Sequence, residues 1–115
     1  MVARIYGVIR YTGGEYVDDK RERLEIWVDK KDAGGLPYQD HKRVDINLFV
    51  GNSKYRSGLR SKPPKTPYVW ICPDLRDTNS QKVSLARVLD ENGFRKNDRV
   101  VLIVNGKDIR LEREL

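Results

Sequence analysis

At 115 residues the chain has the commonest size of a single domain. Its net charge of +6, with 35% charged residues against about 25% on average, favours an anionic partner but indicates no particular fold. No apolar run is long enough to span a membrane, and residues 1–10 lack the apolar stretch of a secretory signal. The single cysteine, Cys72, excludes an internal disulfide. We therefore expect one cytoplasmic domain over residues 1–115.

Apolar and polar residues alternate in the first third of the chain, which predicts two strands. The first strand covers residues 3–11 and ends before a turn at Gly13–Gly14, which a charged segment follows. The second strand covers residues 23–30. Residues 31–42 contain two glycines and a proline, so we expect a loop that can hold one short helical turn.

Three further strands are predicted in the middle of the chain. Residues 43–51 give the clearest alternation, and a hairpin turn at Asn52–Ser53 leads into a strand over residues 54–60. Residues 61–67 contain three prolines, which fix φ and remove backbone donors, so this segment is neither a central strand nor a helix. The fifth strand covers residues 68–72.

One helix is predicted over residues 85–92. Ser84 is a suitable N-cap, because its hydroxyl can accept a hydrogen bond from the first helical turn. Gly93 suits the left-handed position that ends many helices, and Phe94 supplies the apolar contact that often follows it. These signals define both ends of the helix.

The last two strands cover residues 99–104 and 108–112, with Asn105–Gly106 as a strong hairpin signal between them. Residues 100–104 are apolar on both faces, which favours a central strand. Seven strands and one helix before the last hairpin predict a mainly β fold, a small seven-stranded open barrel or pseudobarrel. The expected core residues are Val44, Ile46, Leu48, Leu85, Leu89, Val100, Leu102 and Val104.

The basic charge is concentrated in one segment. No Asp or Glu occurs from Ile46 to Pro73, and residues 52–67 carry five cations, which leaves +1 over the rest of the chain. Lys and Arg neutralise phosphates, and Arg also reads guanine edges. The prolines stiffen the segment, which lowers the ordering cost of binding. We predict a nucleic-acid interface at Lys54, Arg56, Arg60, Lys62 and Lys65. The open alternative is a solvated loop that is basic without a function.

The strand order, with an insertion after the second strand and a helix after the fifth, resembles the DNA-binding pseudobarrel of plant transcription factors and of some restriction-enzyme effector domains. The resemblance implies two arms that grip DNA, here residues 11–21 and 60–67. The second arm coincides with the basic segment, and Arg10 and Thr12 are weaker candidates from the opposing arm. Residues 85–111 are also similar to part of the AbrB-like and SymE-like swapped-hairpin barrels, which are mostly DNA-binding regulators, with some toxins.

Aromatic residues flank the basic segment. Aromatic rings beside cations can stack on unpaired bases, but aromatic residues on strands more often pack in or against a core. We expect such packing for Trp27, Tyr55, Tyr68 and Trp70.

Catalytic and metal-binding signals are sparse. His41 is the only histidine, so no Cys/His cluster exists, and Cys72 is expected to be a small buried residue in a strand. Four carboxylates can in principle hold Mg²⁺, but they fit a turn and a helix surface equally well. These four are Asp74, Asp77, Asp90 and Glu91.

The sequence therefore predicts a non-enzymatic domain with no cofactor, no catalytic residue and no metal ligand. The expected partner is nucleic acid, more readily duplex DNA than RNA. Two alternatives stay open: a protein-interaction module whose basic loop docks an acidic partner, and a toxin-like nuclease.

Overall fold

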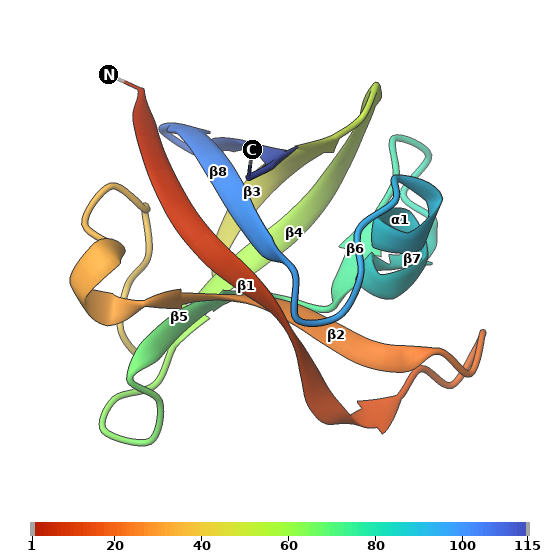
Figure 1. The fold of residues 1–115 in the computed structure, drawn as a ribbon, viewed down its shortest axis with the longest axis horizontal. Coiled ribbons are helices and arrows are strands. Elements are labelled where there is room, and N and C mark those ends of the chain that lie inside the picture. The colour runs from red at the N-terminus through yellow and green to blue at the C-terminus, as the bar shows by residue number, and fades with distance from the viewer. Residues whose placement is uncertain (1, 115) are drawn as a thin grey trace.

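Seven strands form a closed ring in the computed structural model, which describes residues 2–114 (Figure 1). Each strand of the ring pairs with the next, and β3 and β4, the ends of this series, also pair with each other. In sheet order the ring consists of β3 (Val44–Val50), β9 (Asp108–Arg113), β8 (Arg99–Asn105), β1 (Ala3–Glu15), β2 (Glu22–Asp29), β5 (Tyr68–Ile71) and β4 (Ser53–Ser61). The predicted mainly β fold with seven barrel strands and one helix is confirmed, and the barrel is closed rather than open.

The two-sided pairing of β3 closes the barrel. Its antiparallel partner β4 follows it in a hairpin, and its parallel partner is the C-terminal strand β9, with Leu48 opposite Ile109. The parallel contact covers the edge that an open barrel would leave between β3 and β9. At Asn47–Phe49 the backbone of β3 is thereby paired on both sides.

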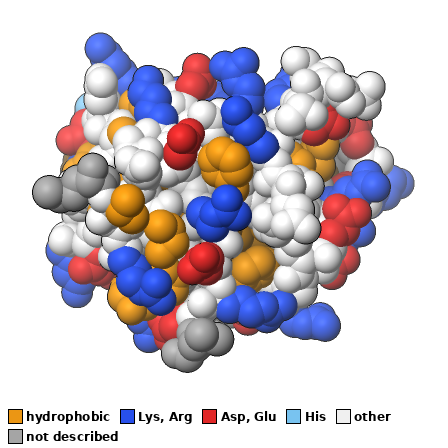
Figure 2. All heavy atoms as spheres, turned by 90° about the horizontal axis from the view of Figure 1, so that it is seen from above, with side chains coloured by type: hydrophobic (Ala, Val, Ile, Leu, Met, Phe, Trp, Pro, Cys, Tyr) orange, Lys and Arg blue, Asp and Glu red, His pale blue; other side chains and the backbone are white. Residues whose placement is uncertain are grey.

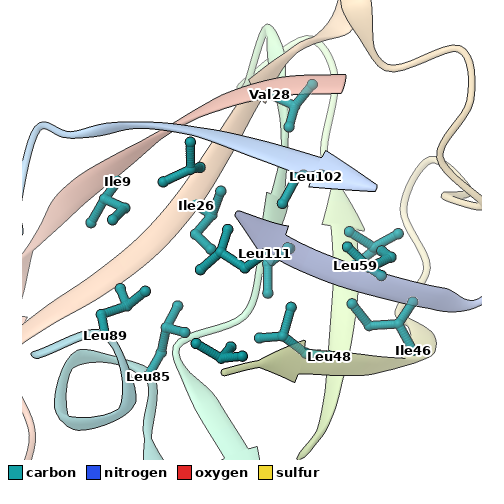
Figure 3. Packing of buried hydrophobic residues seen from close by; sticks show 14 of the residues in the cluster. Ile9, Ile26, Val28, Ile46, Leu48, Leu59, Leu85, Leu89, Leu102 and Leu111 are labelled. Atoms are coloured by element: carbon teal, nitrogen blue, oxygen red, sulfur yellow. The ribbon is translucent and has the colours of Figure 1, made fainter. Parts of the chain in front are cut away.

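Alternating side chains from the ring fill its interior (Figure 3). Ile9, Ile26, Leu48, Leu59 and Leu102 are fully buried there. Seven of the eight expected core residues are buried, and Val44, at the start of β3, is half-buried. As predicted from its two apolar faces, β8 is a central strand between β9 and β1.

The helix α1 (Leu85–Glu91) has the predicted caps. The Ser84 hydroxyl accepts a hydrogen bond from the Arg87 N–H at 3.1 Å, and Gly93 has a φ of +80°. The Phe94 N–H donates to the carbonyl of Leu89 at 2.9 Å. Leu85 and Leu89 add to the barrel core (Figure 3). Within residues 2–114, no helix has the length and apolarity that crossing a membrane requires.

A second hairpin, β6 (Asp74–Arg76) and β7 (Lys82–Ser84), lies outside the ring and was not predicted. It extends the sheet from β4, where β6 pairs through Arg76. Strands of three residues are too short to display an alternation, and the Asp77 turn between them resembles any polar loop. The predicted short helical turn after β2 is present as η1 (Lys30–Asp32).

Three predicted turns differ from the structure. β1 continues through Gly13–Gly14 to Glu15, and the positive φ of Gly13 accompanies an irregularity in the pairing with β2. The other two hairpin turns are Gly51–Asn52 and Gly106–Lys107, each offset from the prediction by one residue. In both turns the glycine comes first, with φ near +60°, because the turn needs a left-handed residue there.

Candidate nucleic-acid interface

The outer face of β4 carries three of the predicted binding residues. Lys54, Arg56 and Arg60 alternate along the strand with inward-facing residues such as Leu59, so they project from one side of the sheet. Alternate residues of a strand lie about 6.7 Å apart, which places Lys54 about 20 Å from Arg60. These cations therefore form a line rather than a compact cluster.

Two further cations join this line from the small hairpin. Arg56 is the direct cross-strand partner of Arg76 on β6, and Arg76 is in turn the partner of Lys82 on β7. Three cations thus occupy one row across three neighbouring strands. On the other side of Arg56 the row continues with Asn47, whose amide donates to the Asp108 carboxylate at 2.8 Å.

Arg43 reaches the line over Gly58. A Cβ built on Gly58 would collide with Nε of Arg43, so the guanidinium group lies directly against this glycine. The space that the absent side chain leaves is occupied by a cation of the same chain. We call the set formed by Lys54, Arg56, Arg60, Arg43, Arg76 and Lys82 the basic stripe.

Most of the basic stripe is electrostatically uncompensated. Within residues 2–114, only Arg43 among its members forms an ion pair, with the exposed Asp45 at 3.5 Å. The nearest acids of the small hairpin are engaged elsewhere: Asp74 pairs with Arg23 at 2.6 Å, and Asp77 accepts hydrogen bonds within its own turn. Figure 2 shows a face of the molecule on which cations and acids are mixed.

Lys62 and Lys65 lie beyond the end of β4, in the turn before β5. The turn is closed by reciprocal hydrogen bonds between Lys62 and Thr66, each at 3.0 Å, and both lysines are exposed. In Figure 1 this turn extends below the barrel on one side, and the end of the β1–β2 hairpin extends below it on the other. Residues 60–67 and the β1–β2 hairpin end are therefore separate projections from the barrel.

Arg10 and Thr12 are not gathered with the basic stripe. Both are exposed residues of β1, and β2 and β5 lie between β1 and β4 in the sheet. Three strand spacings amount to about 14 Å. Arg10 also donates to the Asn97 side chain at 3.1 Å. Arg10 and Thr12 thus lie apart from the basic stripe.

The first arm is fixed to α1 and to the segment that precedes it. The Tyr16 hydroxyl donates to the Pro73 carbonyl at 2.8 Å, and the Ser84 hydroxyl donates to Asp19 at 2.8 Å. Arg21 pairs with Asp90 at 3.0 Å. Asp19 is therefore held by partners of the same chain.

The flanking aromatic residues divide into two groups. Tyr55 packs against the barrel core, as expected, whereas Trp27, Tyr68 and Trp70 are half-buried on the outside of β2 and β5. Trp27 and Tyr68 stack with ring centres 4.0 Å apart and planes 13° from parallel. The Trp27 Nε1–H donates to Glu25 at 2.8 Å. Burial raises the pKa of Glu25, and this hydrogen bond offsets part of the effect.

The candidates for catalysis lie apart from one another. Cys72 is buried as expected, and burial raises the pKa of its thiol, which disfavours the thiolate. His41 is exposed. Within residues 2–114, no three His, Cys, Asp or Glu side chains are grouped to hold a metal ion. Asp74 and Asp90 instead pair with arginines.

No protein-family model, curated protein or solved structure matches this chain. What the site binds must therefore be inferred from its own charges and geometry, and the resemblance to the pseudobarrel stays a prediction.

Proposed function

We propose that the protein is a cytoplasmic DNA-binding domain that holds duplex DNA on the basic stripe. The observation that carries the proposal is the row Arg56, Arg76 and Lys82 across three strands. Like charges placed directly opposite each other destabilise a sheet. A polyanion bound along the row relieves this repulsion, and counterion release adds to the affinity.

The spacing of the basic stripe supports a phosphate backbone as the ligand. Along β4, Lys54 lies about 6.7 Å from Arg56, and Arg56 lies about 13 Å from Arg60, with Arg43 over Gly58 between them. Across the strands the cations are about 4.8 Å apart, and flexible Arg and Lys side chains extend this reach. The strand direction covers about 20 Å, more than half of a helical turn of DNA. Lys62 and Lys65 continue the positive charge beyond the end of β4.

An acidic protein partner would meet the same cations, so salt dependence alone does not separate the two ligands. The test measures fluorescence anisotropy of labelled duplex DNA, single-stranded DNA, RNA and an acidic polypeptide over a range of salt concentrations. Four or five phosphate contacts give a log–log slope of about −3.6 to −4.5 for the duplex.

The informative variant is the pair Arg56→Ala and Arg76→Ala. Loss of two phosphate contacts should flatten the duplex slope by about two. The matched control removes two exposed cations on β1 and in the loop before β8, Arg4→Ala with Arg95→Ala, and should keep the wild-type slope. Equal slopes for both double variants, or tighter binding of the acidic polypeptide than of duplex DNA, would refute the proposal.

A further inference from the structure

A hollow of about 320 Å³ lies on the outer face of the barrel where β1 and β2 separate. Val8 and Trp27 are the last paired residues at this fork; beyond them β1 pairs only with β8, while β2 leads into η1. The volume is at the lower end of the range for small-ligand sites, about 300–1,000 Å³. It suits a single planar group rather than a polymer.

Aromatic rings line opposite sides of this hollow. The stacked pair Trp27 and Tyr68 comes from β2 and β5, and Tyr6 comes from β1. Tyr6 is 45% exposed, so its ring is accessible from solvent. Rings of this kind favour a flat, polarisable ligand.

Both acidic and basic side chains line the same hollow. Asp29 and Asp32 line it, and within residues 2–114 neither forms an ion pair. Arg10 and Arg99 also line it. Arg10 donates to Asn97 and Arg99 pairs with Glu114. Because a guanidinium group has five N–H donors, each arginine keeps donors for a ligand. The hollow thus offers acceptors for amino groups together with donors for a phosphate.

A cross-strand row connects this hollow with the basic stripe. Trp27 is opposite Trp70 on β5, and Trp70 is opposite Arg60 on β4. The distance across these two strand spacings is about 10 Å. A nucleic acid held on the basic stripe can therefore place a neighbouring nucleotide at the hollow.

We propose that the hollow receives one unpaired base of the bound nucleic acid. The base stacks on the aromatic rings, its amino edge donates to Asp29 or Asp32, and its phosphate lies against Arg10 or Arg99. Guanine, cytosine and adenine carry amino groups, whereas thymine has none, so the site discriminates against thymine. The inference rests on the proposed function, because the basic stripe binds the flanking strands.

The test uses Trp70→Phe, which leaves Trp27 as the only tryptophan and hence as a local reporter. Three duplexes of equal length are compared: a fully paired one, one with an extra unpaired guanine and one with an extra unpaired thymine. Stacking should quench Trp27 fluorescence with the guanine duplex and tighten its binding about 5- to 100-fold over the paired duplex. The thymine duplex should fall between them.

Asp29→Ala combined with Asp32→Ala removes both carboxylate acceptors, so it should abolish the preference for guanine over thymine and leave affinity for the paired duplex within about twofold. Glu112→Ala, which removes an exposed carboxylate on β9, is the matched control and should change neither quantity. Equal binding of all three duplexes without quenching overturns the inference while the proposed function stands. If no duplex binds, the proposed function fails and the inference fails with it. Quenching by guanosine monophosphate at the same concentration as the guanine duplex would overturn the inference in favour of a free-nucleotide site.

Discussion

Arg56 of β4 and Arg76 of β6 are direct cross-strand partners, so two arginine side chains leave the sheet at directly opposed positions. Opposed like charges oppose folding, and a bound polyanion compensates them. Under the proposed function, the pair therefore couples the stability of the free protein to its affinity for DNA.

Replacing one member of this pair should stabilise the free protein. Arg76→Gln is expected to raise the free energy of unfolding by roughly 0.2–1 kcal/mol at low salt, because the repulsion is removed. The gain should shrink at about 1 M salt, where the Debye length falls to about 3 Å. Urea denaturation at both salt concentrations measures the difference. A gain that does not depend on salt would contradict the electrostatic explanation.

Gly58→Ala should displace Arg43 without weakening the fold. The added Cβ meets a flexible side chain, and glycine inside a strand is itself unfavourable, so the stability is expected to stay within about 0.5 kcal/mol or rise slightly. The log–log slope of duplex affinity against salt should become less steep by about 0.9, the equivalent of one phosphate contact.

The variant Arg43→Ala should produce the same change in slope, and combining it with Gly58→Ala should add nothing further. This double-mutant cycle separates a positional effect on Arg43 from a direct effect at the glycine. If the two substitutions reduced the steepness of the salt slope additively, Gly58 would contact the ligand independently of Arg43.

Leu102→Ala should destabilise the barrel by roughly 2–5 kcal/mol, the usual cost of truncating a buried leucine. Leu102 lies in the centre of the barrel wall, opposite Ile5 on one side and Leu111 on the other. Chemical denaturation followed by circular dichroism gives the value. Val17→Ala, at a residue that is 91% exposed, serves as the comparison and should change stability by less than about 0.5 kcal/mol.

Glu25 should make the native state less stable as the pH rises. Its pKa is raised by burial, so the folded protein binds a proton more tightly than the unfolded chain does. This contribution is fully present below the ordinary carboxyl pKa of about 4.3 and is lost as the pH rises through the higher folded value. Glu25→Gln keeps an oxygen to accept the Trp27 Nε1–H and should be more stable than wild type at neutral pH.

Thermal melts of wild type and Glu25→Gln at a series of pH values test whether Glu25 causes this pH dependence. Wild type should lose stability relative to Glu25→Gln as the pH rises from about 4 to 7. A constant difference between the two proteins would mean that another group is responsible.

The barrel was predictable because most of its strands alternate cleanly between one buried and one exposed face. Ile9 and Ile26 belong to such strands, and Ser84 with Gly93 defined the helix through local capping chemistry. The hairpin of β6 and β7 was not predictable, since three-residue strands carry no period.

The candidate site was only partly predictable, because charge along the chain does not reveal which carboxylates are already paired. Arg76 lies between Asp74 and Asp77 in the sequence, so the net charge of this segment gives no indication of a basic site. In the fold, Asp74 is bound by Arg23 and Asp77 by its own turn. Arg76 donates to the Ser80 carbonyl at 3.0 Å, and its cross-strand partner is Arg56, which is 20 residues away in the chain.

The parallel contact between β3 and β9 has a consequence for the kinetics of folding. It joins segments about 60 residues apart in sequence, and contacts of large separation slow folding because chain entropy is lost before they form. The hairpin of β3 and β4 can form early, but the ring cannot close until the C-terminal strand has left the ribosome. Until then β3 and β8 each present an unpaired edge, and the nascent chain is open to association with other chains through those edges.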